Sequence, residues 1–168
     1  MTMDTTASEY KAAILISSDR SYEGSREDAS GPVLENRLKD LGFQIIFREI
    51  VPDSENNIIG VLKNWVESGK VDLIITSGGT GVAPTDVTPE ATLKVIEKRI
   101  PGIEEAMRRE SAKFTPNSML SRSVAGIADR ILIINLPGNP QGAMENLNIV
   151  IPALRHALDL INGKKPDL

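Results

Sequence analysis

Short apolar runs recur along the chain, separated by longer segments in which apolar residues appear every third or fourth position. The runs are β-branched or apolar and are bounded by polar, glycine or proline residues, so they predict buried strands. These runs cover residues 12–17, 43–51, 71–76 and 130–136. The spacing of three or four predicts helices at residues 32–41 and 54–67. Apolar strands joined by helical crossovers predict a mostly parallel sheet with helices on both faces.

Another helix is predicted to begin at Thr88, directly after a run rich in glycine and proline. Thr88, Pro89 and Glu90 have the order of an N-cap residue, a first-turn proline and a first-turn acid. The pair Pro101 and Gly102 is expected to end this helix, because both residues interrupt helical patterns.

The C-terminal part of the chain predicts one more helix. From residue 144 onward, apolar residues recur every three or four positions, as in a helix with one buried stripe. Pro152 is expected to kink or restart this helix, because proline lacks the N–H that an interior position needs. His156 lies opposite the stripe, so we expect it to contact solvent or another subunit rather than to act in catalysis.

The composition fits one ordinary globular domain. With 168 residues, of which 40% are hydrophobic and 25% charged, the chain can bury a core but is short for two domains. We expect a short polar N-terminal segment, residues 1–10, and one three-layer α/β/α domain, residues 11–164. The start has no signal-peptide pattern, and no apolar run approaches the roughly 18 residues of a membrane span. We expect a soluble, cytoplasmic protein that does not bind membranes.

Charge and reactive side chains narrow the chemistry further. The net charge is −4 and no dense Lys/Arg block is present, which disfavours binding to nucleic acid. The absence of cysteine excludes disulfides, thiolate nucleophiles and cysteine zinc sites, and a single histidine cannot form a histidine metal cluster. Carboxylates, hydroxyls and backbone amides remain as the groups that could carry a function.

The segments that follow the four predicted strands have unusual compositions. They read SSDRSYEGSREDASG, PDS, SGGTGVAPTD and PGNP. Open α/β sheets bind ligands at the edge formed by the carboxyl ends of their strands. Each segment alone is compatible with a plain turn, since turns also require Gly, Pro, Asp and Ser. Four such segments on one edge favour a binding site.

The glycine-rich segment suggests the kind of ligand. Gly78, Gly79 and Gly81 can adopt positive φ and turn consecutive N–H groups inward, which forms an anion site suited to phosphate. The P-loop pattern G-x-x-x-x-G-K-[ST] is absent, and Pro84 occupies the third glycine position of the dinucleotide pattern G-x-G-x-x-G. We interpret the segment as a site for a nucleotide or another phosphate.

Two aspartates accompany this segment. Asp53 follows the second predicted strand and Asp86 stands at the mouth of the glycine-rich segment. Carboxylates beside phosphates are tolerable when a divalent cation such as Mg²⁺ lies between them, which makes a magnesium–nucleotide site plausible. Capping of the following turns is an equally good interpretation of both aspartates. Ser121, Arg122 and Ser123 could bind a second anion, although a capped polar turn explains that pattern better.

Four motifs together resemble the molybdopterin-binding MogA/MoaB family, in particular its molybdopterin adenylyltransferases. They read VPDS, TSGGTGVAPTDVTPEAT, MLSRSVAGI and IINLPGNPQGA and occur in the family's order. The resemblance implies the molybdopterin-binding fold and transfer of AMP from ATP to the terminal phosphate of molybdopterin, with Mg²⁺ as cofactor. It also implies a homotrimer, with a molybdate-insertion enzyme as partner. Phe114 and Met119, which flank the serine-rich motif, add weak support for a subunit contact.

The resemblance also implies roles for individual residues. Asp53 and Asp86 match aspartates regarded as catalytic and are the expected metal ligands. The implied substrate-binding residues are Asp28, Ser77, Gly78, Gly79, Thr80, Gly81, Ser111, Ser121, Arg122, Asn135, Pro137, Gly138 and Asn139. Thr85 departs from the family pattern, in which many members have a basic residue just before the motif aspartate.

The implied reaction agrees with the lack of a catalytic histidine. Its nucleophile is a phosphate monoester, which is largely ionised near pH 7 because its second pKa is about 6. The protein must then align two phosphate-bearing ligands and neutralise charge. Two alternatives remain: a non-catalytic molybdopterin-binding or carrier protein of the same pathway, and a generic nucleotide-binding or regulatory module.

Overall fold

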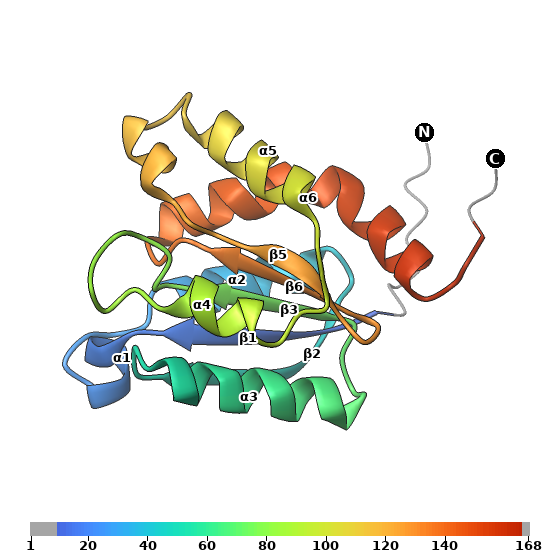
Figure 1. The fold of residues 1–168 in the computed structure, drawn as a ribbon, viewed down its shortest axis with the longest axis horizontal. Helices are drawn as coiled ribbons and strands as arrows, with labels where there is room; N and C mark the ends of the chain where they lie inside the picture. Colours follow the sequence, from blue (N-terminus) through green and yellow to red (C-terminus); the bar gives the residue numbers. More distant parts are fainter. Residues whose placement is uncertain (1–9, 166–168) are drawn as a thin grey trace.

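The computed structural model describes residues 10–165, which form a central sheet flanked by helices (Figure 1). Nine residues of the predicted polar segment at residues 1–10 lie outside the described part, and Tyr10 is buried. In chain order the elements are β1 (Lys11–Ser17), α1 (Asp19–Glu23), α2 (Ser30–Asp40), β2 (Gln44–Val51), α3 (Glu55–Ser68), β3 (Leu73–Ser77), α4 (Thr88–Leu93), β4 (Lys98–Arg99), α5 (Pro101–Ser111), the 3₁₀ helix η1 (Pro116–Leu120), β5 (Ala125–Ala128), β6 (Ile131–Leu136) and α6 (Pro140–Ile161).

The sheet has six strands in the order β2-β1-β3-β6-β5-β4. β2, β1, β3 and β6 are mutually parallel, whereas β5 runs antiparallel to β6 and β4 antiparallel to β5. The four predicted strands and the mostly parallel sheet are therefore confirmed. The sequence analysis missed β4 and β5, because β4 has two exposed charged residues and β5 is a short run interrupted by Gly126.

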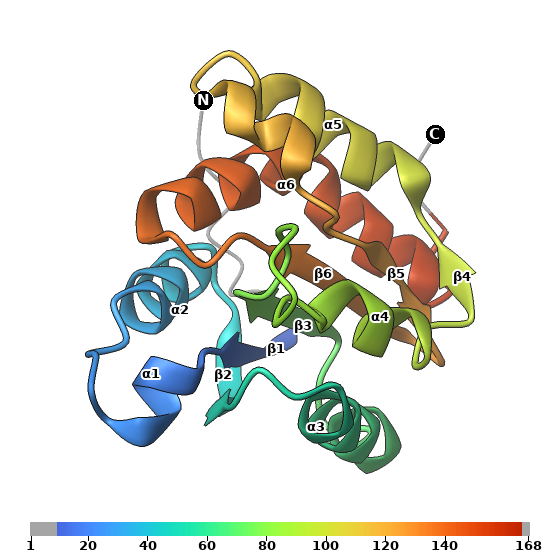
Figure 2. The ribbon, with the colours of Figure 1, turned by 60° about the vertical axis from the view of Figure 1, so that its left-hand side comes forward.

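Alternate residues of the central strands pack into two separate cores. In β1, Ile14 and Ile16 contribute to the core under α2, α5 and α6, while Ala13 and Leu15 contribute to the core under α3 and α4. Figure 2 shows α2 and α6 on one side of the sheet and α3 on the other. This alternation follows from the two-residue period of a strand and confirms the predicted three-layer α/β/α architecture. No helix formed by the described residues combines the length and apolar character needed to cross a membrane.

The predictions around residue 88 require correction. α4 starts at Thr88, but Thr88 is not its N-cap: Val87 occupies that position, and the hydroxyl of Thr88 donates to the Gly78 carbonyl at 2.9 Å. The helix ends at Leu93, well before Pro101. Pro101 occupies the first turn of α5, a position that suits proline because the N–H there needs no helical partner.

The C-terminal helix is longer than predicted. α6 begins at Pro140, where the Asn139 side chain accepts a hydrogen bond from the Gly142 N–H at 3.0 Å. Pro152 lies inside the helix without ending it. Its side chain is exposed, and the buried stripe has residues on both sides of it, the last of which is Leu158. His156 is exposed, as predicted.

Candidate functional site

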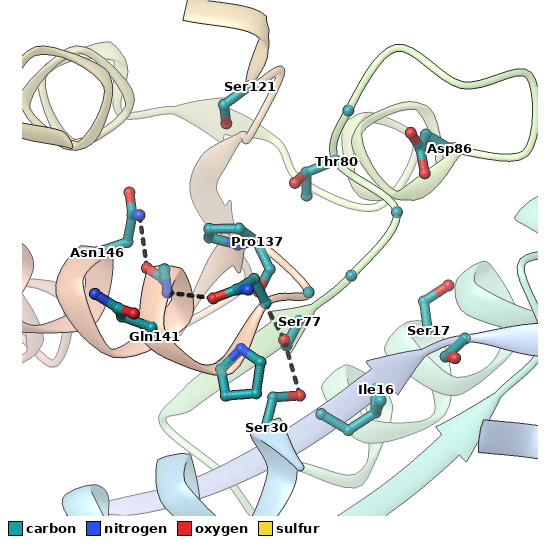
Figure 3. A pocket seen from close by; sticks show the side chains of 18 of the residues that line it. Ile16, Ser17, Ser30, Ser77, Thr80, Asp86, Ser121, Pro137, Gln141 and Asn146 are labelled. Atoms are coloured by element: carbon teal, nitrogen blue, oxygen red, sulfur yellow. Dashed lines mark hydrogen bonds between the residues drawn. The ribbon is translucent and has the colours of Figure 1, made fainter. Parts of the chain in front are cut away.

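An open cleft of about 1250 Å³ lies at the carboxyl ends of the parallel strands, the edge at which the sequence predicted a site. Figure 3 shows residues from β1, β3, α2, α6 and the intervening loops around it. The predicted residues that line the cleft are Asp28, Asp53, Ser77, Gly78, Gly79, Thr80, Gly81, Asp86, Ser111, Ser121, Pro137, Gly138 and Asn139. Segments that are distant in sequence thus contribute to one cavity.

Residues 78–81 form one side of the cleft, which we call the glycine wall. Gly78 and Gly79 have φ values of +102° and +68°. A Cβ atom would overlap the Ser17 carbonyl at Gly78 and the Thr88 hydroxyl at Gly79, so both positions require glycine. The Gly78 N–H donates to the Leu136 carbonyl at 3.1 Å and is not free for a ligand.

The next three N–H groups of the glycine wall differ from that of Gly78. Among the described residues, the backbone N–H groups of Gly79, Thr80 and Gly81 have no hydrogen-bond acceptor. Thr80 is buried and lines the cavity, where Figure 3 shows its side chain between Ser121 and Asp86. Consecutive free N–H groups at a cleft are suited to the oxygens of an anion such as phosphate.

The two aspartates line the cleft and also stabilise its loops. Asp53 accepts hydrogen bonds from the Ser17 hydroxyl at 2.7 Å and the Asp19 N–H at 3.1 Å. Its own N–H donates to the Asp19 carboxylate at 2.8 Å, which places a third carboxylate beside it. Asp86 accepts from the Ala83 N–H at 2.9 Å. Capping of the following turns is therefore not observed: both carboxylates accept from earlier segments, and Ser54 and Val87 are the N-cap residues of the helices that follow.

Each of the two aspartates carries the type of oxygen ligand that Mg²⁺ binds in proteins. Carboxylate oxygens have about four lone-pair sites in total, so Asp53 and Asp86 keep acceptor capacity after the bonds described above. Among the described residues, no group of three or more histidine, aspartate or glutamate side chains is arranged to hold a metal ion. Phosphate oxygens and water would complete the octahedral shell that Mg²⁺ requires.

Another part of the cleft, which we call the hydroxyl wall, consists of Ser111, Ser118 and Ser121 from α5, η1 and the turn that follows. Ser111 is 5% exposed and Ser118 8% exposed, and neither hydroxyl has a hydrogen-bond partner within residues 10–165. Ser121 donates to the Ser123 hydroxyl at 3.1 Å. Buried hydroxyls are normally satisfied, so two free ones beside a cleft favour a polar ligand.

Helix termini add positive electrostatic potential to the cleft. Ser30, at the start of α2, and Gln141, in the first turn of α6, both line it. The Ser77 hydroxyl connects these two ends by donating to the Pro137 carbonyl at 2.8 Å and approaching the Ser30 hydroxyl at 3.3 Å (Figure 3). Two helix N-termini that meet at one cavity favour a negatively charged ligand and offset the nearby carboxylates.

Two predicted substrate-binding residues do not line the cleft. Asn135 is fully buried, and its amide donates to the hydroxyls of Thr76 at 2.9 Å and Thr92 at 3.0 Å while accepting from the Val124 N–H at 3.1 Å. These three hydrogen bonds of the Asn135 amide stabilise the fold beneath the site. Arg122 turns its guanidinium toward backbone carbonyls, not toward the cavity. The structure therefore places neither side chain in the lining of the cleft, and ligand contact by either residue stays a prediction.

Asp28 lines the cleft, but its carboxylate is already engaged. It accepts hydrogen bonds from the Gly31 N–H at 2.9 Å and the Ser30 hydroxyl at 3.3 Å, and pairs with Arg48 at 3.2 Å. These contacts fix the start of α2 beside the cavity. Whether Asp28 also contacts a ligand stays a prediction.

The sequence analysis missed several residues of the cleft. Missed polar lining residues include Ser17, Asp19, Ser30, Arg108, Ser118 and Asn146. Ser118 had a detectable signal, because it lies in the hydroxyl-rich run TPNSMLSRS next to a recognised motif. Arg108 had none: α5 itself was not predicted, and the guanidinium lines the cleft while donating to the Ser123 carbonyl at 3.2 Å.

Known proteins resemble the chain along most of its length. A family model described as "Probable molybdopterin binding domain" matches residues 13–156. A Helicobacter pylori protein named molybdopterin adenylyltransferase is 43% identical over 152 residues, which cover 89% of this chain and 86% of that protein. Gephyrin from Dictyostelium discoideum is 42% identical over 166 residues, covering 93% of this chain but 23% of gephyrin. The chain thus spans less than a quarter of gephyrin.

The fold comparison agrees with the sequence comparison. The solved structure of the molybdopterin biosynthesis Mog protein from Mycobacterium ulcerans superimposes with a TM-score of 0.86 and 42% identity, covering 92% of this chain and 98% of that one. On the strength of the family model and these relatives, the chain belongs to the molybdopterin-binding domain family, of the MogA/MoaB type that its motifs indicated.

Proposed function

We propose that the chain is a molybdopterin adenylyltransferase of molybdenum cofactor biosynthesis. It would transfer AMP from ATP to the terminal phosphate of molybdopterin and release pyrophosphate. One observation carries the proposal: a single cleft contains free backbone N–H groups on the glycine wall and free buried hydroxyls on the hydroxyl wall. Two sets of unsatisfied donors support two polar ligands side by side. The relatives named for this activity, at 43% identity, support it further.

Binding and alignment account for most of the proposed catalysis. A phosphate oxygen of molybdopterin attacks the α-phosphorus of ATP, a new P–O bond forms, and the bond from the α-phosphorus to the bridging oxygen breaks. The free N–H groups of Gly79, Thr80 and Gly81 would hold phosphate oxygens, and the N-termini of α2 and α6 would favour their charge. No general base is needed, since the attacking phosphate is already ionised near pH 7.

The aspartates would have a separate task. Asp53 and Asp86 would hold Mg²⁺ together with ATP, and the ion when bound supplies positive charge that stabilises the transferring phosphate. Carboxylates without such an ion would repel the polyphosphate. Their hydrogen bonds to Ser17 and to the Ala83 N–H keep both carboxylates oriented at the cleft.

The proposal extends to assembly and location. We infer a cytoplasmic homotrimer whose product is passed to a molybdate-insertion enzyme. Exposed apolar side chains near the hydroxyl wall support a protein contact: Phe114 is 67% exposed and Met119 74% exposed. A monomer in light scattering at micromolar concentration would contradict the trimer.

A product assay tests the function. The purified protein is incubated with molybdopterin, ATP and Mg²⁺, and adenylylated molybdopterin is sought by mass spectrometry. We expect the adduct and an equal amount of pyrophosphate. Binding of molybdopterin without product would favour the carrier alternative, and binding of ATP without any affinity for molybdopterin would favour the generic nucleotide-binding module.

A further inference from the structure

The tip of the glycine-rich loop, residues 81–86, has few contacts with the rest of the protein. Residues 82–85 are exposed and belong to no helix or strand. Inside the tip, the Ala83 N–H donates to the Asp86 carboxylate and the Asp86 N–H donates to the Ala83 carbonyl, both at 2.9 Å. These bonds shape the turn but do not attach it to the domain.

Arg122 makes that attachment. Its Nε donates to the Gly81 carbonyl and its Nη2 to the Asp86 carbonyl, both at 2.8 Å. Among the described residues, these are the only hydrogen bonds that connect residues 81–86 to another segment of the chain. The guanidinium therefore fixes both ends of the loop tip, including the residue that carries the proposed metal-binding carboxylate.

The charge of Arg122 is balanced locally. Its Nη1 pairs with Glu90 in the first turn of α4, and the hydrogen bond from Arg122 lowers the pKa of that carboxyl. Glu90 thus stays ionised and orients the guanidinium toward the two carbonyls. Lysine could not reproduce this geometry, because a single ammonium lacks the planar fork that reaches two carbonyls and a carboxylate together.

Arg122 also adjoins the hydroxyl wall. It lies between Ser121, which lines the hydroxyl wall, and Ser123, and its backbone N–H donates to the Thr80 carbonyl at 2.8 Å. In the view of Figure 3, Thr80 lies between Ser121 and Asp86. One residue therefore joins the hydroxyl wall, the glycine wall and the loop tip.

We propose that Arg122 is a positioning residue that holds Asp86 and the loop tip against the hydroxyl wall, and so couples the two ligand sites of the cleft. The proposal rests on the adenylyltransferase function for its catalytic consequence, but the attachment of the loop exists without any ligand. A ligand that orders the hydroxyl wall would stabilise the loop tip through Arg122. A nucleotide that orders the loop tip would in turn raise the affinity of the hydroxyl wall for its ligand by the same factor.

The test compares Arg122→Met and Arg122→Lys with wild type and with Arg109→Met. Arg109 is a matched control, since its side chain is 74% exposed, pairs with Glu110 and does not line the cleft. The first readout is amide hydrogen exchange of peptides spanning residues 82–90 in ligand-free protein. We expect roughly tenfold faster exchange in Arg122→Met, an intermediate rate in Arg122→Lys and no change in Arg109→Met.

The second readout separates positioning from general damage. In Arg122→Met we expect kcat to fall by about tenfold to hundredfold, with the KM for molybdopterin within roughly twofold of wild type. Arg122→Lys should recover part of kcat. If Arg122→Met has the exchange rate and the kcat of wild type, the proposal is wrong. It is also wrong if Arg122→Met loses melting temperature, kcat and affinity to the same degree and Arg122→Lys recovers none of them.

The outcome also distinguishes this proposal from the proposed function. If wild type forms no adenylylated product while the loop peptides of Arg122→Met exchange faster, the function fails and the attachment by Arg122 stands. If wild type forms the product and the loop peptides of Arg122→Met exchange at the wild-type rate, the proposed function stands and the attachment by Arg122 is wrong. Should Arg122→Met fail to fold, Arg122→Lys provides the same comparison, and wild-type exchange in that variant would overturn the proposal.

Discussion

The glycine wall and the hydroxyl wall of the cleft leave different groups without partners. On the glycine wall the free groups are backbone N–H groups, and their arrangement depends on the positive φ of Gly78 and Gly79. On the hydroxyl wall the free groups are the side chains of Ser111 and Ser118. A substitution on the hydroxyl wall removes one donor, whereas a substitution on the glycine wall alters the backbone, and one at Asp53 or Asp86 removes a carboxylate beside that wall. We therefore expect larger losses from the glycine wall.

The largest effect is expected from the aspartates beside the glycine wall. Asp53→Asn and Asp86→Asn should each lower the rate of adenylyl transfer by about 10²–10³-fold and largely spare molybdopterin binding, because an amide binds Mg²⁺ more weakly than a carboxylate. The rate is measured by product formation and the affinity by titration. If both carboxylates hold one ion, the double variant should be little slower than either single variant.

The hydrogen bonds that the same aspartates accept lead to a different expectation, in which stability is lost instead of catalysis. If Asp53 and Asp86 only stabilise turns, their loss should cost about 0.5–2 kcal/mol in the free energy of unfolding and leave the folded fraction active. Denaturant titration of each variant measures that cost. Near wild-type turnover in a folded Asp86→Asn variant would show that the carboxylate does not act in transfer.

A residue beneath both walls should affect stability instead of binding. Asn135→Ala removes three hydrogen bonds and leaves the Val124 N–H and the hydroxyls of Thr76 and Thr92 to find other partners. We expect a loss of about 2–4 kcal/mol in the free energy of unfolding, since unsatisfied buried groups are costly. Ligand affinities of the folded fraction should stay within about twofold. A selective loss of molybdopterin affinity would identify Asn135 as a ligand contact.

Gly81→Val is expected to have a smaller and more local effect on the glycine wall. Gly81 lacks a positive φ, and the nearest atom to an added Cβ is the Asp86 carboxylate oxygen at 2.9 Å. The flexible carboxylate should move while the fold persists, so we expect roughly tenfold weaker binding of ATP with Mg²⁺ and little change in melting temperature. Gly60→Val on α3, where an added Cβ meets no atom within 4 Å, is the control. Equal effects in both variants would contradict a local cause.

The fold was predictable where one pattern dominated a segment. The central strands β1, β3 and β6 are buried on both faces, so their apolar runs were visible in the sequence. α5 was not visible, because Glu104 occupies a buried position where the pattern requires an apolar residue. Arg99 and the Ala125 N–H satisfy that carboxylate, and both lie outside the helix. The apolar pattern of α5 itself therefore gives no signal that a buried carboxylate is satisfied there.

The site was predictable as a set of loops but not as a set of contacts. The parallel order of β2, β1, β3 and β6 places their carboxyl ends at one edge, which is why Asp53 after β2, Gly79 after β3 and Pro137 after β6 line the same cleft. The direction of the Arg122 side chain depends on its meeting Gly81 and Asp86, some forty residues earlier in the chain. Only the folded structure reveals that approach.

The smallest effects are expected on the hydroxyl wall. Ser118→Ala and Ser111→Ala each remove one buried hydroxyl that lacks a partner, so the ligand-free variants should be as stable as wild type or slightly more stable. If these hydroxyls bind molybdopterin, each variant should bind it about fivefold to tenfold more weakly, since a hydrogen bond contributes about 1 kcal/mol. ATP affinity should not change.

Ser68→Ala provides the control for this pair of effects. The Ser68 hydroxyl donates to the Trp65 carbonyl at 2.6 Å at the end of α3 and does not line the cleft. Its removal should lower stability slightly and leave both affinities alone, the opposite of what we expect for Ser118→Ala. Melting curves measure the stability, and separate titrations measure the affinities for ATP and molybdopterin. If Ser118→Ala weakens ATP binding as much as molybdopterin binding, the two walls do not hold separate ligands, because a hydroxyl on one wall would then serve both.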